Sequence, residues 1–208
     1  MYYNVFIDMT KITLLKLYIL RRVVIMKKAA VFLADGFEEV EALTQIDLLR
    51  RAGIDVKVVA VGEGTLVKGA HNIGIMADEG FNYDSLLAFD AIVLPGGMPG
   101  TENLYNFAPL KDLINRFNDE GKIIAAICAA PSVFGRMGLL NGKKACCYPG
   151  FEGYLKGAVV ETGSVSRDGN VITSRGVGTA IDFAAEIIKS LLNAETADRV
   201  LREIIYRP

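Results

Sequence analysis

The chain has 208 residues, a length that suits one sizeable α/β domain better than two small ones. Its 23 basic and 24 acidic side chains give a formal net charge of -1, and no basic stripe is interleaved with aromatic residues, which argues against binding to a nucleic-acid backbone. Three sparse cysteines without a CxxC motif are typical of a reducing, cytoplasmic compartment, and a single histidine argues against a His-based metal site.

The first 25 residues are apolar but are interrupted by lysines and arginines. The longest uncharged run is shorter than the roughly 20 residues that a membrane span needs, and the order of a signal peptide is missing. Met26 precedes KKAAVFLADG, which is typical of a first strand. We therefore predict an N-terminal extension at 1–25, arising from a mis-called start, and one domain at 26–208. A mass spectrum of the native protein that begins well upstream of Met26 would refute this start.

Apolar runs alternate with helical patterns, which predicts a mostly parallel sheet covered by helices on both faces. In the first half we expect a strand at Ala29–Leu33, a helix over 35–53 closed by Gly53, a strand at Val56–Val61, a β-hairpin between Gly62 and Gly80, and a strand at Ala91–Leu94 that runs into the turn PGGMPG. In the second half we expect a helix at Leu110–Phe117, a strand at Ile123–Ile127, a helix at Ala130–Leu139, a hairpin of Ala158–Val165 and Asn170–Thr173, and helices at Thr179–Leu192 and Ala194–Ile205.

Three unusual segments follow predicted strands: ADGFEEVE, LPGGMPG and AAICAAP. Ligands of open α/β sheets bind at the carboxyl ends of the strands, so the topology brings these segments to one edge. The sequence therefore predicts a site there.

Cys128 lies where a buried strand turns into a helix, in the pattern of a nucleophile elbow. Its alanine neighbours permit a tight turn, and Pro131 suits the first turn of the helix. Amide dipoles at the helix N-terminus are expected to lower the pKa of the thiol and favour a thiolate. The alternative is a packed core thiol, since free cysteine is commonly buried.

The glycine turn offers backbone donors. Gly96 and Gly97 can direct N–H groups at an anion and form an oxyanion hole with the amide of Ala129. Alternatively, the glycines serve only a turn with positive φ.

Glu38, Glu39 and Glu41 crowd the start of the first helix, where acidic residues complement the helix dipole. Helical periodicity places Glu38, Glu41 and Gln45 on one sector beside the apolar side. One carboxyl buried there would have a raised pKa and could donate a proton to a thiolate. The spacing does not decide which glutamate this is.

His71, the only histidine, falls in the predicted hairpin after the second strand, so we expect it at the surface or at an interface. A Cys–His peptidase needs an imidazole beside the thiol. The residue after Cys128 is alanine, so the sequence lacks a local Cys–His pair.

The segments AAVFLADGFEEVEA, IDLLRRAG, AIVLPGGMPG, IAAICAAP and VITSRGVGT resemble, in order and spacing, the ThiJ/PfpI superfamily, and within it the deglycase and YajL-like branch. The resemblance covers residues 27 to 193. It implies a flavodoxin-like three-layer sandwich of the class I glutamine amidotransferase-like type, with a mostly parallel central sheet, no cofactor, no metal and a homodimeric assembly.

The resemblance also implies roles for individual residues. The reactive cysteine of the family falls on Cys128, its acidic partner on Glu41, and its amide donor on Gly97, beside the amide of Ala129. Two positions depart from the family: Ala129 replaces the histidine of PfpI-type peptidases, and Tyr148 stands where deglycase relatives often have a histidine before a proline.

These features indicate a Cys128-dependent glyoxalase or deglycase that acts on methylglyoxal, glyoxal or their adducts. The alternative is an oxidative-stress sensor or redox-regulated chaperone that uses oxidation of Cys128 without turnover. Cys146 and Cys147 are candidate resolving thiols, although buried packing is the simpler interpretation. A peptidase is disfavoured because the histidine is missing.

Overall fold

The computed structural model describes residues 26–207, so the predicted extension at 1–25 lies outside the described residues. Its central sheet has seven strands in the order β10-β11-β7-β6-β1-β2-β5. Every pairing in this sheet is parallel except β10 with β11. The strands are β1 (Lys28–Leu33), β2 (Asp55–Ala60), β5 (Glu79–Gly80), β6 (Ala91–Leu94), β7 (Ile123–Ile127), β10 (Val165–Asp168) and β11 (Val171–Ser174).

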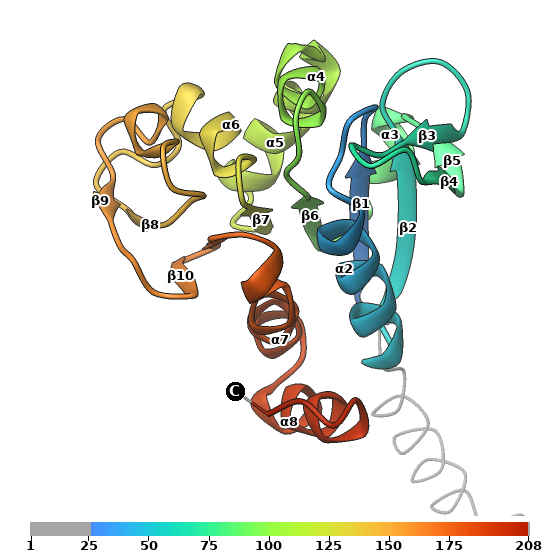
Figure 1. Cartoon of the computed structure of the whole chain (residues 1–208), viewed down its shortest axis with the longest axis vertical. Helices are drawn as coiled ribbons and strands as arrows, with labels where there is room; N and C mark the ends of the chain where they lie inside the picture. The colour runs from blue at the N-terminus through green and yellow to red at the C-terminus, as the bar shows by residue number, and fades with distance from the viewer. Residues whose placement is uncertain (1–25, 208) are drawn as a thin grey trace, which may run out of the picture.

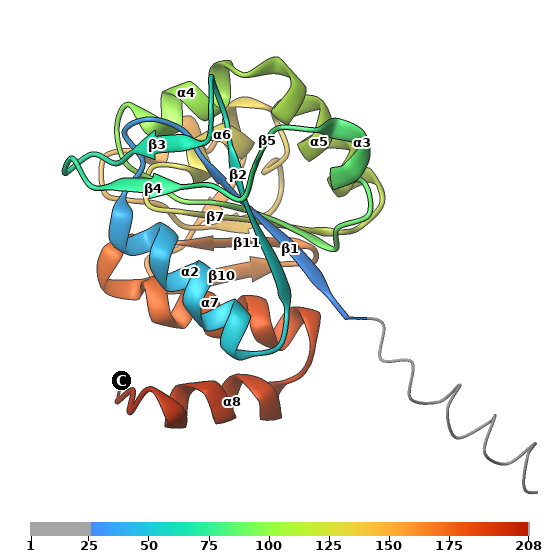
Figure 2. The ribbon, with the colours of Figure 1, turned by 90° about the vertical axis from the view of Figure 1, so that its right-hand side faces the viewer.

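Helices cover both faces of the sheet and make a three-layer α/β sandwich (Figures 1 and 2). On one face lie α2 (Glu39–Arg51), α7 (Ala180–Leu191) and, outside them, α8 (Ala194–Glu203). On the other face lie α3 (Tyr83–Leu86), α4 (Gly100–Asn106), α5 (Ala108–Asp119) and α6 (Pro131–Arg136). None of the helices among the described residues is long and apolar enough to cross a membrane.

The core forms on both faces because successive strand residues point to opposite sides. In β1, Ala29, Val31 and Leu33 pack in the cluster beneath α2 and α7, while Ala30 and Phe32 pack in the cluster beneath α4 and α5. This explains why the strands appear in the sequence as uninterrupted apolar runs.

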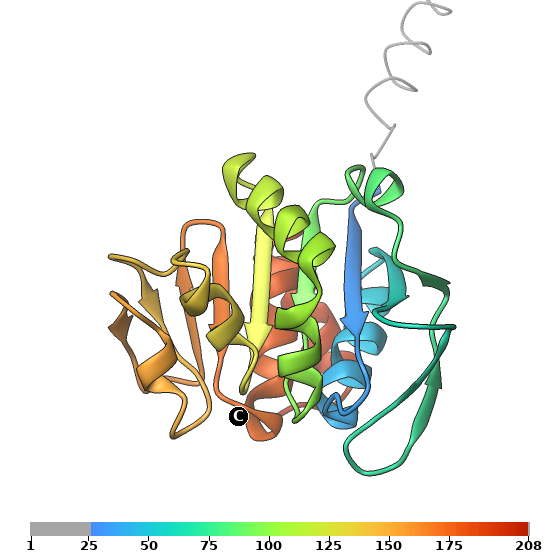
Figure 3. The same cartoon turned by 90° about the horizontal axis from the view of Figure 1, so that it is seen from above.

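Two small additions flank the sheet (Figure 3). β3 (Leu66–Lys68) and β4 (Gly74–Met76) form the expected antiparallel hairpin between β2 and β5. β8 (Lys144–Ala145) and β9 (Val159–Val160) form a short parallel pair at the opposite end. The second hairpin therefore begins at Val165 and not at Ala158, because the valines of β9 pair with β8.

Tertiary contacts also shorten the first helix. It begins at Glu39, whereas the sequence predicted residue 35, because Gly36 has a left-handed φ of 86° and Glu38 N donates to Gly96 O at 2.9 Å. Helix α4 was not predicted, since its start overlaps the glycine- and proline-rich turn. The carboxyl ends of β1, β6 and β7 nevertheless meet at one edge, as expected.

Candidate active site

Cys128 follows β7 with a left-handed backbone, φ 65°, which is unusual for a residue with a side chain. Two hydrogen bonds hold it there: Cys128 N donates to Ser174 O at 3.0 Å, and Tyr148 N donates to Cys128 O at 2.8 Å. Such a backbone costs of order 1–3 kcal/mol and persists only where its surroundings enforce it. The turn places a partly exposed thiol at the carboxyl edge of the sheet, which agrees with the predicted elbow.

Glu41 lies in the first turn of α2 and is completely buried. Its Oε2 accepts a hydrogen bond from Gly96 N at 2.8 Å, while Oε1 has no fixed partner. Burial raises the pKa of this carboxyl to about 7, although hydrogen bonds from Gly96 and Cys128 oppose the rise. Glu41 is thus the buried glutamate that the helical pattern left unassigned, and it lies beside the thiol.

Gly96 permits this pairing because it has no side chain. A Cβ built on Gly96 would lie 2.6 Å from Cys128 Cβ and 2.9 Å from Glu41 Oε2. The Gly96 amide is also occupied by the carboxyl of Glu41, so it is not free to serve as an oxyanion donor. This corrects the expectation that Gly96 belongs to the oxyanion hole.

The backbone amides of Gly97 and Ala129 donate to the side chain of Cys128, and both of these interactions lower the pKa of the thiol. A Cβ on Gly97 would lie 2.4 Å from Glu38 N, so glycine is required for the turn to approach α2. The geometry therefore brings two backbone donors and one carboxyl to a single sulfur atom.

The pKa of Cys128 moves opposite to the direction expected from the helix dipole. Burial and the negative charge of Glu41 raise the thiol pKa to about 12, and the two amides offset only part of that rise. As pH rises past about 7, the carboxyl of the pair therefore ionises before the thiol.

Glu39 is buried as well, but its carboxylate contacts His71 and not the thiol of Cys128. Its carboxylate accepts hydrogen bonds from His71 N at 2.7 Å and Ile73 N at 3.4 Å, and it pairs with His71 Nδ1 at 2.9 Å. Burial pushes the pKa of Glu39 up, but these bonds outweigh burial and lower it. Together with Glu38, these groups could approach one metal ion, yet both Glu39 oxygens already bind His71. The exposed His71 thus ties the β3–β4 hairpin to α2, as a surface residue.

Cys146 and Cys147 are free thiols, both buried. Cys146 N donates to Thr173 Oγ1 at 2.9 Å, and Cys147 belongs to the core cluster beneath α4 and α5. Both side chains therefore have packing roles that account for them.

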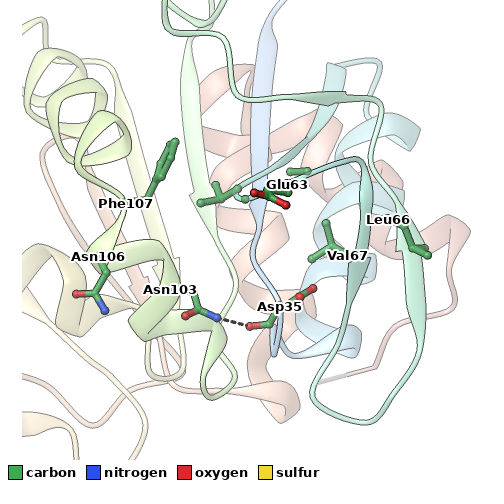
Figure 4. A pocket seen from close by; sticks show the side chains of 10 residues that line it. Asp35, Glu63, Leu66, Val67, Asn103, Asn106 and Phe107 are labelled. Atoms are coloured by element: carbon green, nitrogen blue, oxygen red, sulfur yellow. Dashed lines mark hydrogen bonds between the residues drawn. The ribbon is translucent and has the colours of Figure 1, made fainter.

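A cavity of about 350 Å³ opens near the same sheet edge but is separate from the thiol (Figure 4). It lies between the β3–β4 hairpin and the end of α4. Two of its lining residues are joined by a hydrogen bond, in which Asn103 Nδ2 donates to the backbone oxygen of Asp35 at 2.8 Å. Glu63 and Phe107 also line it, while Cys128 and Glu41 do not. The reactive pair thus lies outside this cavity.

The sequence analysis did not predict that Gly176 lies beside the thiol. Tyr148 and Gly176 both lie beside Cys128: a Cβ on Gly176 would be 3.3 Å from Tyr148 Cδ2 and 3.9 Å from Cys128 Sγ. Gly176 belongs to the segment VITSRGVGT, which carried the family resemblance without a role for any of its residues. That segment was the available signal.

Comparison with known proteins is consistent with this architecture. Residues 27–190 match the model of the DJ-1/PfpI family. Protein dj-1beta of Drosophila melanogaster is 38% identical over 181 residues, which cover 86% of this chain and 97% of that protein. Protein DJ-1 homolog B of Arabidopsis thaliana is 41% identical over 184 residues, or 88% of this chain. The chain spans less than half of the two plant relatives it matches, 42% and 47% of their lengths.

Solved structures show the same fold. The structure described as oxidized DJ-1 of Toxoplasma gondii superimposes with a TM-score of 0.83 at 35% identity, covering 88% of this chain and 100% of that one. The crystal structure of Drosophila melanogaster DJ-1beta gives a TM-score of 0.82 at 36% identity with the same coverage. The flavodoxin-like sandwich predicted from the sequence is therefore confirmed.

Proposed function

The chain belongs to the DJ-1/PfpI family, and on the geometry of its Cys128–Glu41 pair we propose that it is a cysteine-dependent glyoxalase or deglycase. Its substrates are methylglyoxal, glyoxal or the adducts that they form with proteins and nucleotides. The reaction needs no cofactor and no metal in this proposal, because the thiol, the carboxyl and the backbone amides supply a nucleophile, a proton carrier and hydrogen-bond donors.

One observation carries the proposal: the fully buried carboxyl of Glu41, with a pKa near 7, lies against the thiol of Cys128. A general acid–base group works best when its pKa lies near the operating pH. The partners of Glu41 are the amide of Gly96 and the thiol, and no cation is among them.

In the first step, the Glu41 carboxylate takes the thiol proton while Cys128 Sγ forms a bond to the aldehyde carbon. The proton then passes to the aldehyde oxygen, which gives a hemithioacetal, and the amides of Gly97 and Ala129 stabilise the negative charge that develops during attack. The hydrogen on the attacked carbon leaves as a proton to Glu41 and returns to the neighbouring carbon. The hydroxyl proton moves from the oxygen of the attacked carbon to the oxygen of its neighbour, which produces a 2-hydroxy thioester. Water hydrolyses the thioester to lactate or glycolate and regenerates the thiol.

Peptide-bond hydrolysis by a Cys–His pair does not fit this site. Ala129 follows Cys128, and the single histidine, His71, is paired with Glu39. A glyoxalase requires only the proton carrier that Glu41 provides.

The test is a glyoxalase assay with lactate detection for the wild type, Cys128→Ala and Glu41→Gln. We expect no turnover above background for Cys128→Ala, and roughly a 10²–10⁴-fold loss for Glu41→Gln, the usual contribution of one acid–base group. Cys147→Ala, which removes a buried thiol elsewhere, is the matched control and should retain activity. If Cys128→Ala consumes methylglyoxal at the wild-type rate, the proposal is wrong.

The second candidate is a redox sensor or redox-regulated chaperone, favoured by the position of Glu41 beside a partly exposed thiol. Peroxide would convert Cys128 to a sulfenic and then a sulfinic acid, each step consuming one peroxide and releasing one water. A protonated Glu41 can donate a hydrogen bond to the sulfinate. Mass spectrometry after mild peroxide treatment decides: no gain of two oxygen atoms at Cys128 would exclude this role.

We also propose that the protein forms a homodimer. Exposed apolar side chains gather on α2 and the hairpin strand β4, including Val40 and Met76, with Ile73 directly before β4. The Glu39–His71 pair joins these two elements, so the side chains belong to neighbouring parts of the surface. Light scattering coupled to size exclusion tests the proposal, and a monomeric mass at micromolar concentration would contradict it.

A reducing, cytoplasmic compartment is the location that we propose. All three cysteines are free thiols, and a nucleophilic thiol must stay reduced to act. Fractionation of cells that produce the protein, followed by thiol labelling, tests both points.

A further inference from the structure

The cavity beside the β3–β4 hairpin lies at an edge where α/β sheets bind ligands, yet the proposed reaction does not use it (Figure 4). Strand β1 pairs with β2 on one side and with β6 on the other. The helices that follow β1 and β6 cover opposite faces, α2 on one and α4 on the other. Ligands of open α/β sheets bind outside the carboxyl ends of the strands at such a reversal. Asp35 follows β1 and Ala60 ends β2, so the cavity is at this position.

Hydrogen bonds hold the walls of the cavity in place. Asn103 Nδ2 on α4 donates to Asp35 O at 2.8 Å, and Lys68 N on β3 donates to Asp35 Oδ1 at 2.8 Å. Gly36 N donates to Lys68 O at 2.7 Å. The segment after β1 is therefore tied to both α4 and the hairpin, and the cavity between them is preformed. Its volume of about 350 Å³ suits a small molecule, because such sites span roughly 300–1,000 Å³.

Part of the cavity lining is apolar. Ala60, Val61 and Val67 are buried, and Phe107 is partly buried in the core cluster beneath α4 and α5. The ring of Phe107 meets the ring of Phe81 edge-on, with 5.1 Å between the centroids. This contact fixes the Phe107 ring, so a flat apolar group in the cavity can pack against it.

The remaining lining carries negative charge and no positive charge. Asp35 and Glu63 supply carboxylates, Asn103 and Asn106 supply amides, and no lysine, arginine or histidine lines the cavity. Within residues 26–207, neither carboxylate forms an ion pair. Carboxylates without a counter-ion attract cations, and hydrogen bonds from an ammonium group to a carboxylate are strengthened by the charge.

We propose that this cavity binds a small organic cation, in which an ammonium group is attached to a flat apolar body. The ammonium group donates hydrogen bonds to the carboxylates of Asp35 and Glu63, and the apolar body packs on Phe107 and the buried valines. A cation close to the Phe107 ring is also attracted by the face of that ring. Neither Cys128 nor Glu41 lines the cavity, so the proposal does not rest on the glyoxalase function.

A metal ion suits the cavity less well than an organic cation. Calcium and magnesium ions bind to several oxygen ligands and gain nothing from an aromatic ring. Among the described residues, the three acidic or imidazole side chains that lie close enough to hold a metal ion are Glu38, Glu39 and His71, which are outside the cavity.

NMR titration of the full-length, 15N-labelled protein tests the proposal with four probes. We expect 2-phenylethylammonium to shift the backbone amides of Gly62 and Glu63 and the side-chain amide of Asn106, with a Kd on the order of 1 mM for about nine heavy atoms. 2-Phenylethanol keeps the ring without the charge and should bind roughly fivefold more weakly. Methylammonium keeps the charge without the ring and should bind roughly tenfold more weakly. Phenylacetate, which carries the opposite charge, should give no saturable shift.

Two isosteric variants test the carboxylates. Asp35→Asn keeps an acceptor for Lys68 N, and Glu63 is exposed, so neither Asp35→Asn nor Glu63→Gln should disturb folding. Each should raise the Kd of 2-phenylethylammonium roughly two- to fivefold, the range of a partly exposed ion pair, and the double variant roughly five- to twentyfold. Glu195→Gln, which removes an exposed carboxylate from α8 on the opposite face, is the matched control and should keep the wild-type Kd.

Three results overturn the proposal. The first is an equal Kd for 2-phenylethylammonium and 2-phenylethanol, or no saturable shift by about 20 mM. The second is a set of shifts centred on the amides of Gly97 and Ala129, which would place the probe at the thiol. The third is an unchanged Kd in the double variant, whose amide spectrum also shows that it is folded. The titration involves no turnover, so its outcome is independent of the glyoxalase assay.

Discussion

Replacing Glu41 by glutamine removes a carboxyl that is buried without a cation beside it. Its pKa in the folded protein is about 7, against 4.5 for an ordinary glutamate. The native state therefore holds this proton more tightly than the unfolded chain, and stability is lost as pH rises from 4.5 to about 7. At roughly 1.36 kcal/mol per pKa unit, the ionised carboxyl costs the fold about 3 kcal/mol above neutrality.

Glutamine keeps the acceptor for Gly96 N and carries no charge, so Glu41→Gln should be close to wild type in acid and more stable in alkali. Urea unfolding at about pH 5 and about pH 8.5 measures this, and the stability difference should grow by about 2–3 kcal/mol in favour of the variant. In thermal unfolding, this corresponds to about 4–12 °C for a chain of this size.

Glu39→Gln is the matched control with the opposite sign. Glu39 is also buried, but its pKa is lowered by its hydrogen bonds with His71 and nearby amides, which outweigh burial. Its contribution is present above the unfolded pKa and is lost in acid, so Glu39→Gln should be most destabilising at neutral pH. The titration of His71 is common to the wild type and Glu41→Gln and cancels in their difference. Parallel pH–stability curves for the wild type and Glu41→Gln would refute the burial argument.

Three further outcomes follow from the same geometry. Gly96→Ala places a methyl group 2.6 Å from Cys128 Cβ and should destabilise the fold by roughly 1–3 kcal/mol in urea unfolding, while Gly153→Ala, which has open space, should not. The pKa of His71, raised by Glu39 and measured by NMR on the only histidine, should fall toward 6.5 in Glu39→Gln; an unchanged titration would contradict the pair. Iodoacetamide should label Cys128 alone in the native protein, at a rate that keeps rising with pH into the alkaline range because burial and the charge of Glu41 raise the thiol pKa to about 12. Mass spectrometry that finds rapid labelling of all three thiols would contradict the burial of the other two.

Strong local signals made the central sheet predictable. Ala91–Leu94 and Ile123–Ile127 appear in the structure with the predicted bounds, because strands buried on both faces are continuous apolar runs. The first helix was predicted four residues too early, since contacts with the glycine turn, and not helix propensity, fix the loop before Glu39.

Cys128 itself could be found from the sequence, because a thiol between a buried strand and small residues marks a tight turn. The glutamate could not be assigned from spacing. Glu39 and Glu41 are both buried in the same turn of α2, and only the packing of that helix on the β3–β4 hairpin and on the glycine turn gives them different partners.

The sequence by itself determined the α/β class, the strands that meet at one edge, and the cysteine at that edge, since each depends on residues that are neighbours in the chain. Only the tertiary structure decided that the pKa of Cys128 rises, that the Gly96 amide serves Glu41, and that Tyr148 and Gly176 border the thiol. Burial, charge and contact at a site depend on segments far apart in sequence, and no local pattern encodes the distances between them.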